Sequence, residues 1–459
     1  MKSSRKSVHK KAHAIPDIRF EDHRLTSFAG LVIFQKFFAL IGLKASLAQC
    51  FRHLGKGKVF GRATIFLQLI VHILLGYREL RDCQFYQDDP LVKRVLGLEK
   101  LPDVATISRM LRMADEKSVQ RLRDLLKQLT LQRLAKLGLV RITLDFDGSV
   151  QSTKRRAQGS AVGFNKKKKG ARSYYPLFCT IAQTGQVFDF LHRSGNVHDS
   201  NGAKEFILCC VEQIRRALPG VVIEVRMDSA FFSDEIVMGL AEEDVELTIS
   251  VPFERFVELK DLIEQRNRWI RINEDVSYFE SQWKPKSWNR RFRFLFVRTR
   301  SKKQQKGPVQ LDLFEPHEYG YEFKVIVTNK EVGAQTIVEY HEGRGSQENV
   351  FGQLKTQCQM DYIPVQTCTG NQIYLLAVLF AHNLVRELQM TTRPRERGTT
   401  RGRATLWCFE QVDTLRKTII QRAGRLTQPR GRITLTFCRG KLLKERLLQI
   451  LENLDSLAA

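Results

Sequence analysis

Three acidic residues, far apart in the chain, have the types and the settings of a metal-dependent site. Asp147 follows the strand-like run "RITLDF", and Asp228 follows "VVIEVRM". A strand holds the side chain at its end in place, while the loop that follows admits a substrate. Glu348 lies in a helix-like segment and could complete a site for two divalent cations about 4 Å apart. Such a pair of cations is what phosphodiester cleavage requires.

The three acids also have ordinary readings. An Asp at the end of a strand is usually a turn or capping residue, and a single Glu on a helix is usually solvated. The first position is also ambiguous, because Asp145 lies two residues before Asp147 and faces the same side of a strand. Carboxylate oxygens and substrate phosphates suit Mg²⁺, with Mn²⁺ as a substitute, better than zinc.

A later segment, "VEYHEGRGSQENVFGQLK", carries polar residues at gaps of four, four and seven: Tyr340, Arg344, Glu348 and Lys355. On one helix, at ~100° per residue, all four lie within an arc of ~80°. The shared face holds a ring, a guanidinium, a carboxylate and an ammonium. Gly343 and Gly345 weaken the helix beside Arg344, so the helix could instead begin near Ser346.

The charge of the chain indicates its partner. Its 459 residues include 75 Lys and Arg against 49 Asp and Glu, for a net charge of +26. Such an excess attracts polyanions through phosphate contacts and counterion release. We therefore expect nucleic-acid binding, with a ribosome-associated protein or simply a basic protein as the alternatives.

Other classes are disfavoured by the cysteines and the apolar runs. Nine Cys, an odd number without a C-x-x-C pair, predict reduced thiols in a cytosolic protein and no zinc site. The most apolar run, residues 63–77, is interrupted by Gln68 and His72 and is shorter than the ~20 residues of a membrane span. It predicts a buried helix and no membrane role.

The elements that would position these residues change in type along the chain. Residues 1–20 read as a basic arm, and the period is helical from Leu25 to about Leu137. Within this part, "LPDVATISRMLRMAD" offers Asp103 or Thr106 as a cap for a short basic helix. That helix could be the reading helix of a helix-turn-helix-like unit or an ordinary member of a helical bundle.

From Arg141 the pattern predicts the order β-β-β-α-β-α-β, which matches an RNase H-like α/β fold. Asp147 and Asp228 then end the first and fourth strands, which are neighbours in a parallel arrangement. The expected organisation is as follows: a helical DNA-binding domain at 1–137, the first part of the core at 138–251, a β-rich insertion at 252–335, the second part of the core with the Glu helix at 336–390, and a basic C-terminal region at 391–459.

The insertion contains two tryptophans among cations. Trp283 and Trp288 lie between Lys284, Lys286, Arg290, Arg291 and Arg293. Rings in such a setting can stack on an exposed base while the charges hold the strand. The alternative is that either Trp belongs to the core of a small β domain. The loop 165–173, "NKKKKGARS", could likewise contact phosphates or be solvated surface.

Together, "DGS" after one strand, "RMDS" after another and the pattern Y-x3-R-x3-E-x6-K resemble the DDE transposases of bacterial insertion sequences. More narrowly, they resemble the group with a Tyr-Arg-Glu-Lys signature, over roughly residues 25–450. The signature is fairly specific, whereas "DGS" alone is weak. The resemblance implies Asp147, Asp228 and Glu348 as the metal-binding catalytic triad, since this family places its first Asp directly before such a Gly-Ser pair. Asp145 is then a flanking acid.

The resemblance further implies that Tyr340, Arg344 and Lys355 hold the DNA backbone, and that an aromatic residue of the insertion receives a flipped base. The implied activity is cut-and-paste transposition, through a hairpin, on double-stranded terminal inverted repeats and target DNA. A homodimer on DNA, acting at the nucleoid in the cytoplasm, is expected. A DNA-binding protein without chemistry and a nuclease that does not rejoin strands are the competing hypotheses.

Overall fold

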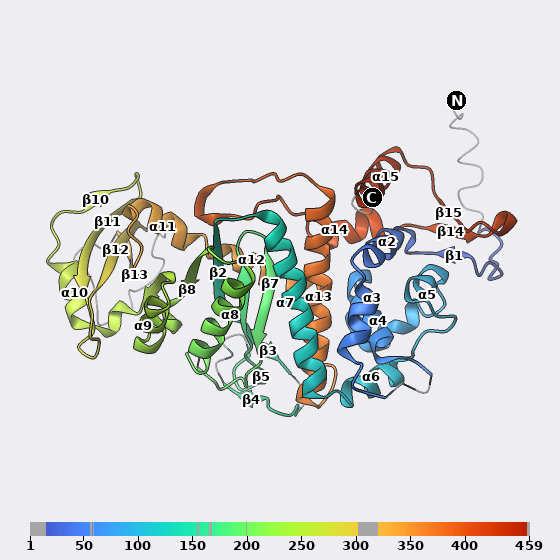
Figure 1. Ribbon diagram of the computed structural model, residues 1–459, viewed down its shortest axis with the longest axis horizontal. Helices are drawn as coiled ribbons and strands as arrows, with labels where there is room; N and C mark the ends of the chain where they lie inside the picture. The colour runs from blue at the N-terminus through green and yellow to red at the C-terminus, as the bar shows by residue number, and fades with distance from the viewer. Residues whose placement is uncertain are drawn as a thin grey trace.

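The computed structural model describes residues 15–456, except for 56, 58, 154–155, 164, 166–167, 199 and 302–319. Most of the predicted basic arm and two lysines of the loop 165–173 lie outside the described residues. Helices form the N-terminal part as predicted: α2 (Val32–Leu40), α3 (Leu43–Cys50), α4 (Arg62–Leu75), α5 (Pro90–Leu96), α6 (Val104–Arg112) and α7 (Glu116–Leu137). Helices α2 to α6 lie at the right of Figure 1, and α7 lies in the middle beside α13.

Local signals in the sequence explain where these helices begin and end. Of the two caps considered for α6, Asp103 is the one used, because its Oδ1 accepts a hydrogen bond from the Thr106 N–H at 2.8 Å. Asp115 caps α7 in the same way. Gly138, at φ 57°, ends α7 in the left-handed conformation that glycine adopts most readily. The chain then turns into the first strand of the large sheet.

The large sheet has nine strands in the order β10-β11-β12-β13-β9-β8-β2-β6-β7. The predicted order β-β-β-α-β-α-β is present as β2 (Arg141–Gly148), β6 (Leu177–Ile181), β7 (Gln186–Leu191), α8 (Ala203–Ala217), β8 (Val222–Met227), α9 (Asp234–Glu242) and β9 (Glu246–Val251). Strands β2, β8 and β9 are parallel. Strand β6 is antiparallel to β2, and β7 is antiparallel to β6, so β7 runs in the same direction as β2. Three short strands, β3 (Gln151–Ser152), β4 (Ala161–Val162) and β5 (Arg172–Tyr174), form a separate small sheet.

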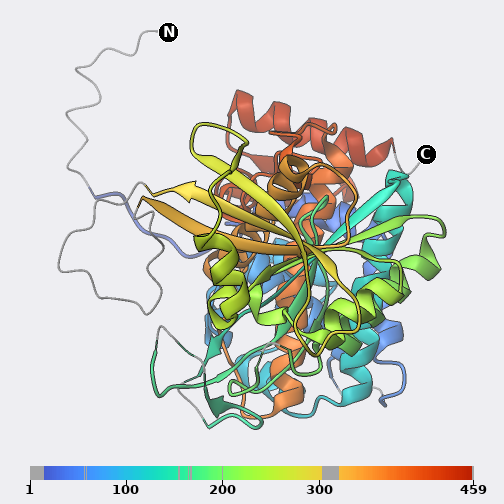
Figure 2. The same ribbon diagram turned by 90° about the vertical axis from the view of Figure 1, so that its left-hand side faces the viewer.

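The segment 252–335, predicted as a β-rich insertion, continues this sheet. It comprises α10 (Val257–Glu264), β10 (Ile270–Arg271), β11 (Val276–Trp283), β12 (Phe292–Arg300) and β13 (Tyr321–Thr328). Strand β13 pairs antiparallel with β9, from Val325 opposite Val251 to Thr328 opposite Thr248. Figure 2 shows these long strands extending from the parallel ones.

The two faces of β2, β8 and β9 differ in polarity. Alternate residues of β2 and β8, including Leu144 and Val225, pack with α8 and α9 in one large hydrophobic cluster. The residues between them are polar and occupy the opposite face, which α11 (Ala334–Glu342) and α12 (Gly345–Gln357) cover. Because side chains alternate along a strand, the polar and apolar sets are already separated in the sequence.

The remaining elements close the molecule around a long buried helix, α13 (Cys368–Thr392). Helix α13 lies against α4, α7 and edge strand β7 of the large sheet. The Asn383 amide accepts from Val187 N–H at 2.9 Å and donates to Val187 O at 2.7 Å, which satisfies that strand edge. The chain ends with α14 (Val412–Leu415), β14 (Gly424–Thr427), β15 (Thr434–Phe437) and α15 (Lys441–Asp455).

Within the described residues, no single helix has the length and apolar composition of a membrane span. One bent pair, Ala29–Leu40 with Leu43–Cys50, meets those two criteria together.

Candidate active site

Asp147 and Asp228 lie at the carboxyl ends of two neighbouring parallel strands. The pairing of β2 with β8 runs from Arg141 opposite Val222 to Asp145 opposite Arg226. Continuing this register by two residues places Asp147 opposite Asp228 on the polar face. Both side chains are partly exposed. The fold therefore brings two of the three predicted carboxylates together at the carboxyl ends of β2 and β8.

Each of these carboxylates is held by the backbone beside it. The Gly148 N–H donates to Asp147 Oδ1 at 2.7 Å, and the Ala230 N–H donates to Asp228 Oδ1 at 3.0 Å. A Cβ at position 148 would lie 2.4 Å from the ring of Tyr175, so the glycine after Asp147 leaves room for that ring. These contacts fix the direction in which each carboxylate points.

Helix α12 crosses the same face, and Arg344 at its N-terminus reaches Asp147. Gln347 Nε2 donates to Asp145 O at 3.0 Å, and Arg344 Nη1 lies 3.3 Å from Asp147 Oδ2. Further along, the Phe351 ring packs on Phe178 of β6 with centroids 5.4 Å apart. Glu348 is exposed and lies one turn after Arg344, on the same side of the helix.

The predicted signature segment is not one continuous helix. It divides into α11 and α12 at Gly343 and Arg344, close to the alternative start that the two glycines suggested. Arg344, Glu348 and Lys355 all belong to α12 or its N-cap, whereas Tyr340 belongs to α11. The predicted single face of four residues is therefore wrong at its first member.

Tyr340 is in the interior, with only 4% of its surface exposed. Its ring lies between the Arg226 guanidinium, 5.1 Å from the ring centroid, and Lys330 Nζ, at 4.6 Å. Its hydroxyl is buried and has no hydrogen-bond partner among the described residues. Tyr340 is therefore packed in the interior in this structure, and its contact with a DNA phosphate stays a prediction.

The two tryptophans of the insertion differ from each other in burial. Trp288 is 3% exposed and packs on Phe232 and Phe292, as in the core alternative. Trp283 is partly buried against Phe256 and Phe294. Trp288 therefore presents no face for a base in this structure, whereas part of Trp283 is accessible.

Asp145 and Arg226 form a buried ion pair that the sequence reading missed. Arg226 Nε and Nη2 donate to the two carboxylate oxygens of Asp145 at 2.6 Å and 2.8 Å. With both oxygens occupied, Asp145 is a structural partner, and Asp147 is the acid left at the strand end. The signal was present, because Arg226 precedes Asp228 by two residues just as Asp145 precedes Asp147.

A second charged cluster lies further from the strand ends on the same face. Glu224 is fully buried and accepts hydrogen bonds from Thr143, Lys330, Arg141 and Arg403. Burial by itself would raise the pKa of Glu224, but the hydrogen bonds from Arg403 and Lys330 outweigh it and lower the pKa to about 2. Glu224 is therefore an ionised carboxylate that ties β2, β8 and the loop after α13 together.

His341, next to Tyr340, is held between two hydroxyls of β9. Its Nδ1 lies 3.0 Å from Thr248 Oγ1, and its Nε2 lies 2.8 Å from Ser250 Oγ. Burial, together with the nearby Lys324 and Arg344, keeps its pKa well below the ordinary value. His341 is thus neutral and fastens the end of α11 to the sheet.

Hard oxygen donors make up the predicted metal site. Asp147, Asp228 and Glu348 supply only carboxylates, the ligand type that Mg²⁺ and Mn²⁺ prefer, so the donor set fits these ions. Within the described ranges, no three His, Cys, Asp or Glu side chains are already grouped closely enough to hold a metal ion. The Arg344 guanidinium is the positive charge beside Asp147 in this arrangement.

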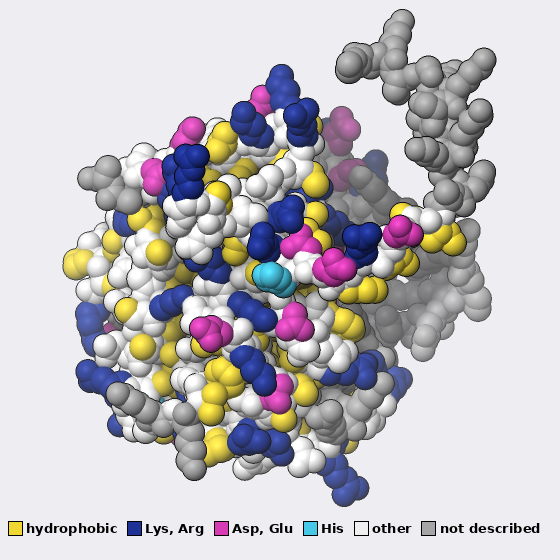
Figure 3. Space-filling view, turned by 90° about the vertical axis from the view of Figure 1, so that its right-hand side faces the viewer, with side chains coloured by type: hydrophobic (Ala, Val, Ile, Leu, Met, Phe, Trp, Pro, Cys, Tyr) yellow, Lys and Arg dark blue, Asp and Glu magenta, His cyan; other side chains and the backbone are white. Residues whose placement is uncertain are grey.

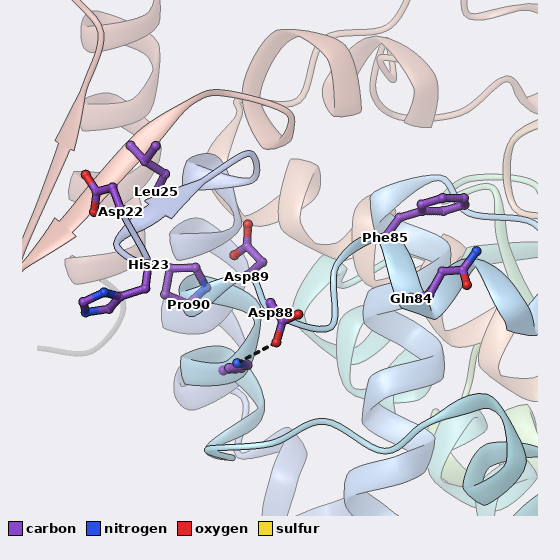
Figure 4. Close-up of a pocket in the computed structure, with 9 residues that line it drawn as sticks. Asp22, His23, Leu25, Gln84, Phe85, Asp88, Asp89 and Pro90 are labelled. Atoms are coloured by element: carbon purple, nitrogen blue, oxygen red, sulfur yellow. Dashed lines mark hydrogen bonds and ion pairs between the residues drawn. The ribbon is translucent and has the colours of Figure 1, made fainter. Parts of the chain in front are cut away.

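Two cavities lie away from these residues. One, of about 710 Å³, is lined by residues such as Asp22, His23 and Asp89 near the N-terminal helices (Figure 4). The other, of about 860 Å³, lies between α2, α7 and α13. Neither cavity includes Asp147, Asp228 or Glu348.

Comparison with known proteins defines the class of this chain. The family model described as "Transposase DDE domain group 1" matches residues 10–459. The chain therefore belongs to this family of DDE transposase domains. No curated protein matches the chain.

Two solved structures that match this chain are distant from it in sequence. A piggyBac transposase synaptic complex with hairpin DNA is 11% identical, with 93% of this chain and 85% of that chain covered, at a TM-score of 0.41. A Mos1 mariner paired end complex with Mn is 11% identical, with 53% and 70% covered, at a TM-score of 0.17. At these TM-scores, no residue role is transferred from either structure.

Proposed function

We propose that this protein is a cut-and-paste DNA transposase of the Tyr-Arg-Glu-Lys group, acting at the ends of a bacterial insertion sequence. One observation carries the proposal beyond family membership. Asp147 and Asp228 end adjacent parallel strands, and the helix that bears Glu348 is joined to the first of them through Arg344. This is the arrangement expected of an RNase H-like core built from residues 138–251 and 336–390.

In this proposal the three carboxylates hold Mg²⁺ or Mn²⁺. When bound, a pair of such ions activates the attacking oxygen and stabilises the leaving oxygen of a phosphodiester. The backbone N–H groups of Gly148 and Ala230 keep the two aspartates aimed outward. Water would first attack a phosphodiester at the end of the element and displace a 3′-hydroxyl. That hydroxyl would attack the opposite strand and displace its 3′-oxygen, which closes a hairpin. A second water would open the hairpin, and the released 3′-hydroxyl would attack a phosphodiester of target DNA and displace its 3′-oxygen.

The cations of α12 would hold the strand being cut. Arg344 presents a planar fork that can grip a phosphate with two hydrogen bonds. Lys355, about three turns after Arg344 on α12, would act as a point charge on a more distant phosphate. Trp283, the more accessible of the two insertion tryptophans, could stack on an extruded base.

The N-terminal helices, within residues 1–137, would bind the terminal inverted repeats. Helix α6 buries Ile107 and Leu111 and exposes Arg109 and Arg112, as a helix does when it rests on a bundle and faces a polyanion. Figure 3 shows basic side chains spread over the N-terminal side of the molecule, with acidic ones between them. A reading helix and an ordinary bundle helix are distinguished by the effect of Arg109→Ala on the sequence preference of binding.

Cleavage at both ends of an element requires two active sites, so we propose a homodimer on DNA. The basic C-terminal region, residues 391–459, is our candidate for part of that contact.

The test is a cleavage and joining assay with duplexes that carry the ends of the element, in the presence of Mg²⁺. We expect nicking at the ends and strand joining into a second duplex by the wild type. Asp147→Asn, Asp228→Asn and Glu348→Gln should each lower nicking by at least ~10³-fold, because each removes a metal ligand. DNA affinity should remain within about twofold, since uncut DNA is held by other contacts.

Three results would contradict the proposal. A wild type that binds the ends but never cuts them supports a DNA-binding protein without chemistry. Cutting without joining supports a nuclease. Cleavage by Asp228→Asn at the normal rate removes that residue from the mechanism.

A further inference from the structure

Arg226 is a fully buried guanidinium that connects three separate segments of the chain. It lies on β8, and its Nε and Nη2 bind both carboxylate oxygens of Asp145 on β2. Its Nη1 donates to Tyr340 O at 2.8 Å and to Gly402 O at 2.6 Å. The first of these carbonyls is near the end of α11, and the second is in the loop after α13.

The contact with Tyr340 O acts on the end of a helix. The last carbonyls of a helix have no partner within it, and positive charge is favourable there. Arg226 supplies both a donor and a charge to the last turn of α11, and its guanidinium also lies over the Tyr340 ring. The end of α11 is thereby fixed relative to β8, the strand that leads to Asp228.

Gly343 allows the end of α11 to approach Arg226 and Gly402 this closely, because no residue with a side chain fits at this position. A Cβ at position 343 would lie 1.9 Å from Gly402 O and 2.3 Å from Arg226 Nη1. The backbone of Gly343 is in the right-handed helical region, at φ −57°, so the glycine is required for space rather than for conformation. Gly345, two residues on, differs because its Cβ would meet nothing within 4 Å.

Arg344 directly follows Gly343 in the chain, and its guanidinium reaches Asp147. Glu348 follows one turn later. The break between α11 and α12 therefore sets where both side chains stand. We propose that Arg226 is a positioning residue of the reaction centre, which holds this break so that Glu348 faces the ends of β2 and β8. This inference rests on the proposed function and assigns a role to a residue outside the predicted triad.

The two glycines provide a matched pair of variants. Gly343→Ala should push the break away from Arg226 and lower the rate of strand cleavage by about 100-fold, as a displacement near 1 Å can do. DNA affinity should stay within about twofold. Gly345→Ala adds the same methyl group two residues away into open space, so cleavage should match the wild type.

Arg226→Lys tests the guanidinium itself. A lysine keeps the charge but cannot bind two carboxylate oxygens and two carbonyls at once. We expect slower cleavage and a higher Mg²⁺ concentration for the half-maximal rate, measured at a temperature at which the variant is folded. A purely structural role would lower the fraction of active protein without moving that Mg²⁺ concentration.

The outcomes separate this inference from the proposed function. If the wild type does not cut DNA, both fall together. If Asp228→Asn abolishes cleavage but Gly343→Ala and Arg226→Lys retain the wild-type rate and Mg²⁺ dependence, only the positioning role is overturned. Should Gly343→Ala not fold, the Mg²⁺ dependence of Arg226→Lys decides alone.

Discussion

The two faces of β2, β8 and β9 are made by the same strands, yet they are organised on different principles. On one face, alternate residues such as Leu144 and Met227 join a continuous apolar cluster with α8 and α9. On the other, Asp145, Arg226 and Glu224 are fixed by hydrogen bonds to specific atoms. Apolar packing depends mainly on volume, whereas the polar face depends on distance and direction. Two neighbouring residues of one strand therefore differ in role: one packs in the apolar cluster, and the next takes part in the polar face that carries the candidate site.

The largest effect on stability is expected from Met227→Ala. Met227 is fully buried on the apolar face and immediately precedes Asp228. Removing its side chain leaves a cavity, so the free energy of unfolding should fall by about 2–5 kcal/mol, measured by denaturant titration. Below its unfolding temperature, the folded variant should still cut DNA. Asp228→Asn should do the opposite and keep stability while losing cleavage. Equal effects of both variants on both measurements would show that the faces are not separate.

A somewhat smaller effect is expected from Glu224→Gln, and it depends on pH. Because the pKa of Glu224 is lowered from 4.5 to about 2, its ionised form stabilises the fold above pH 4.5. That stabilisation is lost as the pH falls towards 2. The difference in unfolding free energy between wild type and variant should therefore shrink by about 3 kcal/mol from pH 6 to pH 2. A difference that does not vary with pH would mean that Glu224 contributes only as a neutral hydrogen-bonding group.

The smallest effect is expected from Lys355→Ala, on the helix that covers the polar face. As a phosphate contact, Lys355 should contribute about 1 kcal/mol to binding, equally for all DNA sequences. The slope of log affinity against log salt concentration should fall by about 1. Binding titrations at several salt concentrations measure both. An unchanged slope with weaker binding would place Lys355 in the folding of α12 rather than at the DNA.

Much of the sheet that carries the candidate site could be predicted from the sequence because its signals are local. The alternation in "RITLDFDG" and "VVIEVRMD" predicts the two strands, and each Asp at its end follows from the same pattern. The roles of Tyr340 and Trp288 could not be predicted, because burial depends on which distant segments pack on them. The Tyr340 ring is enclosed by Arg226 and Lys330, residues 114 and 10 positions away in the chain.

The contacts of Arg226 and Gly402 lie beyond sequence reading for the same reason. Nothing in "TTRGRAT" indicates that its glycine carbonyl reaches the middle of the sheet. The glycines beside Arg344 were a usable signal of a break, but not of the close approach that makes Gly343 necessary.

The hydrogen bonding of β13 to β9 has a consequence for any shortened form of the chain. Deleting residues 252–335 would remove β13, the strand that pairs with Val251 and its neighbours, and would leave β9 as an unpaired edge strand. Unpaired edge strands form hydrogen bonds with strands of other molecules. A shortened protein that kept every carboxylate of the candidate site would thus be expected to aggregate. Residues 252–335 therefore protect β9 from pairing with other molecules.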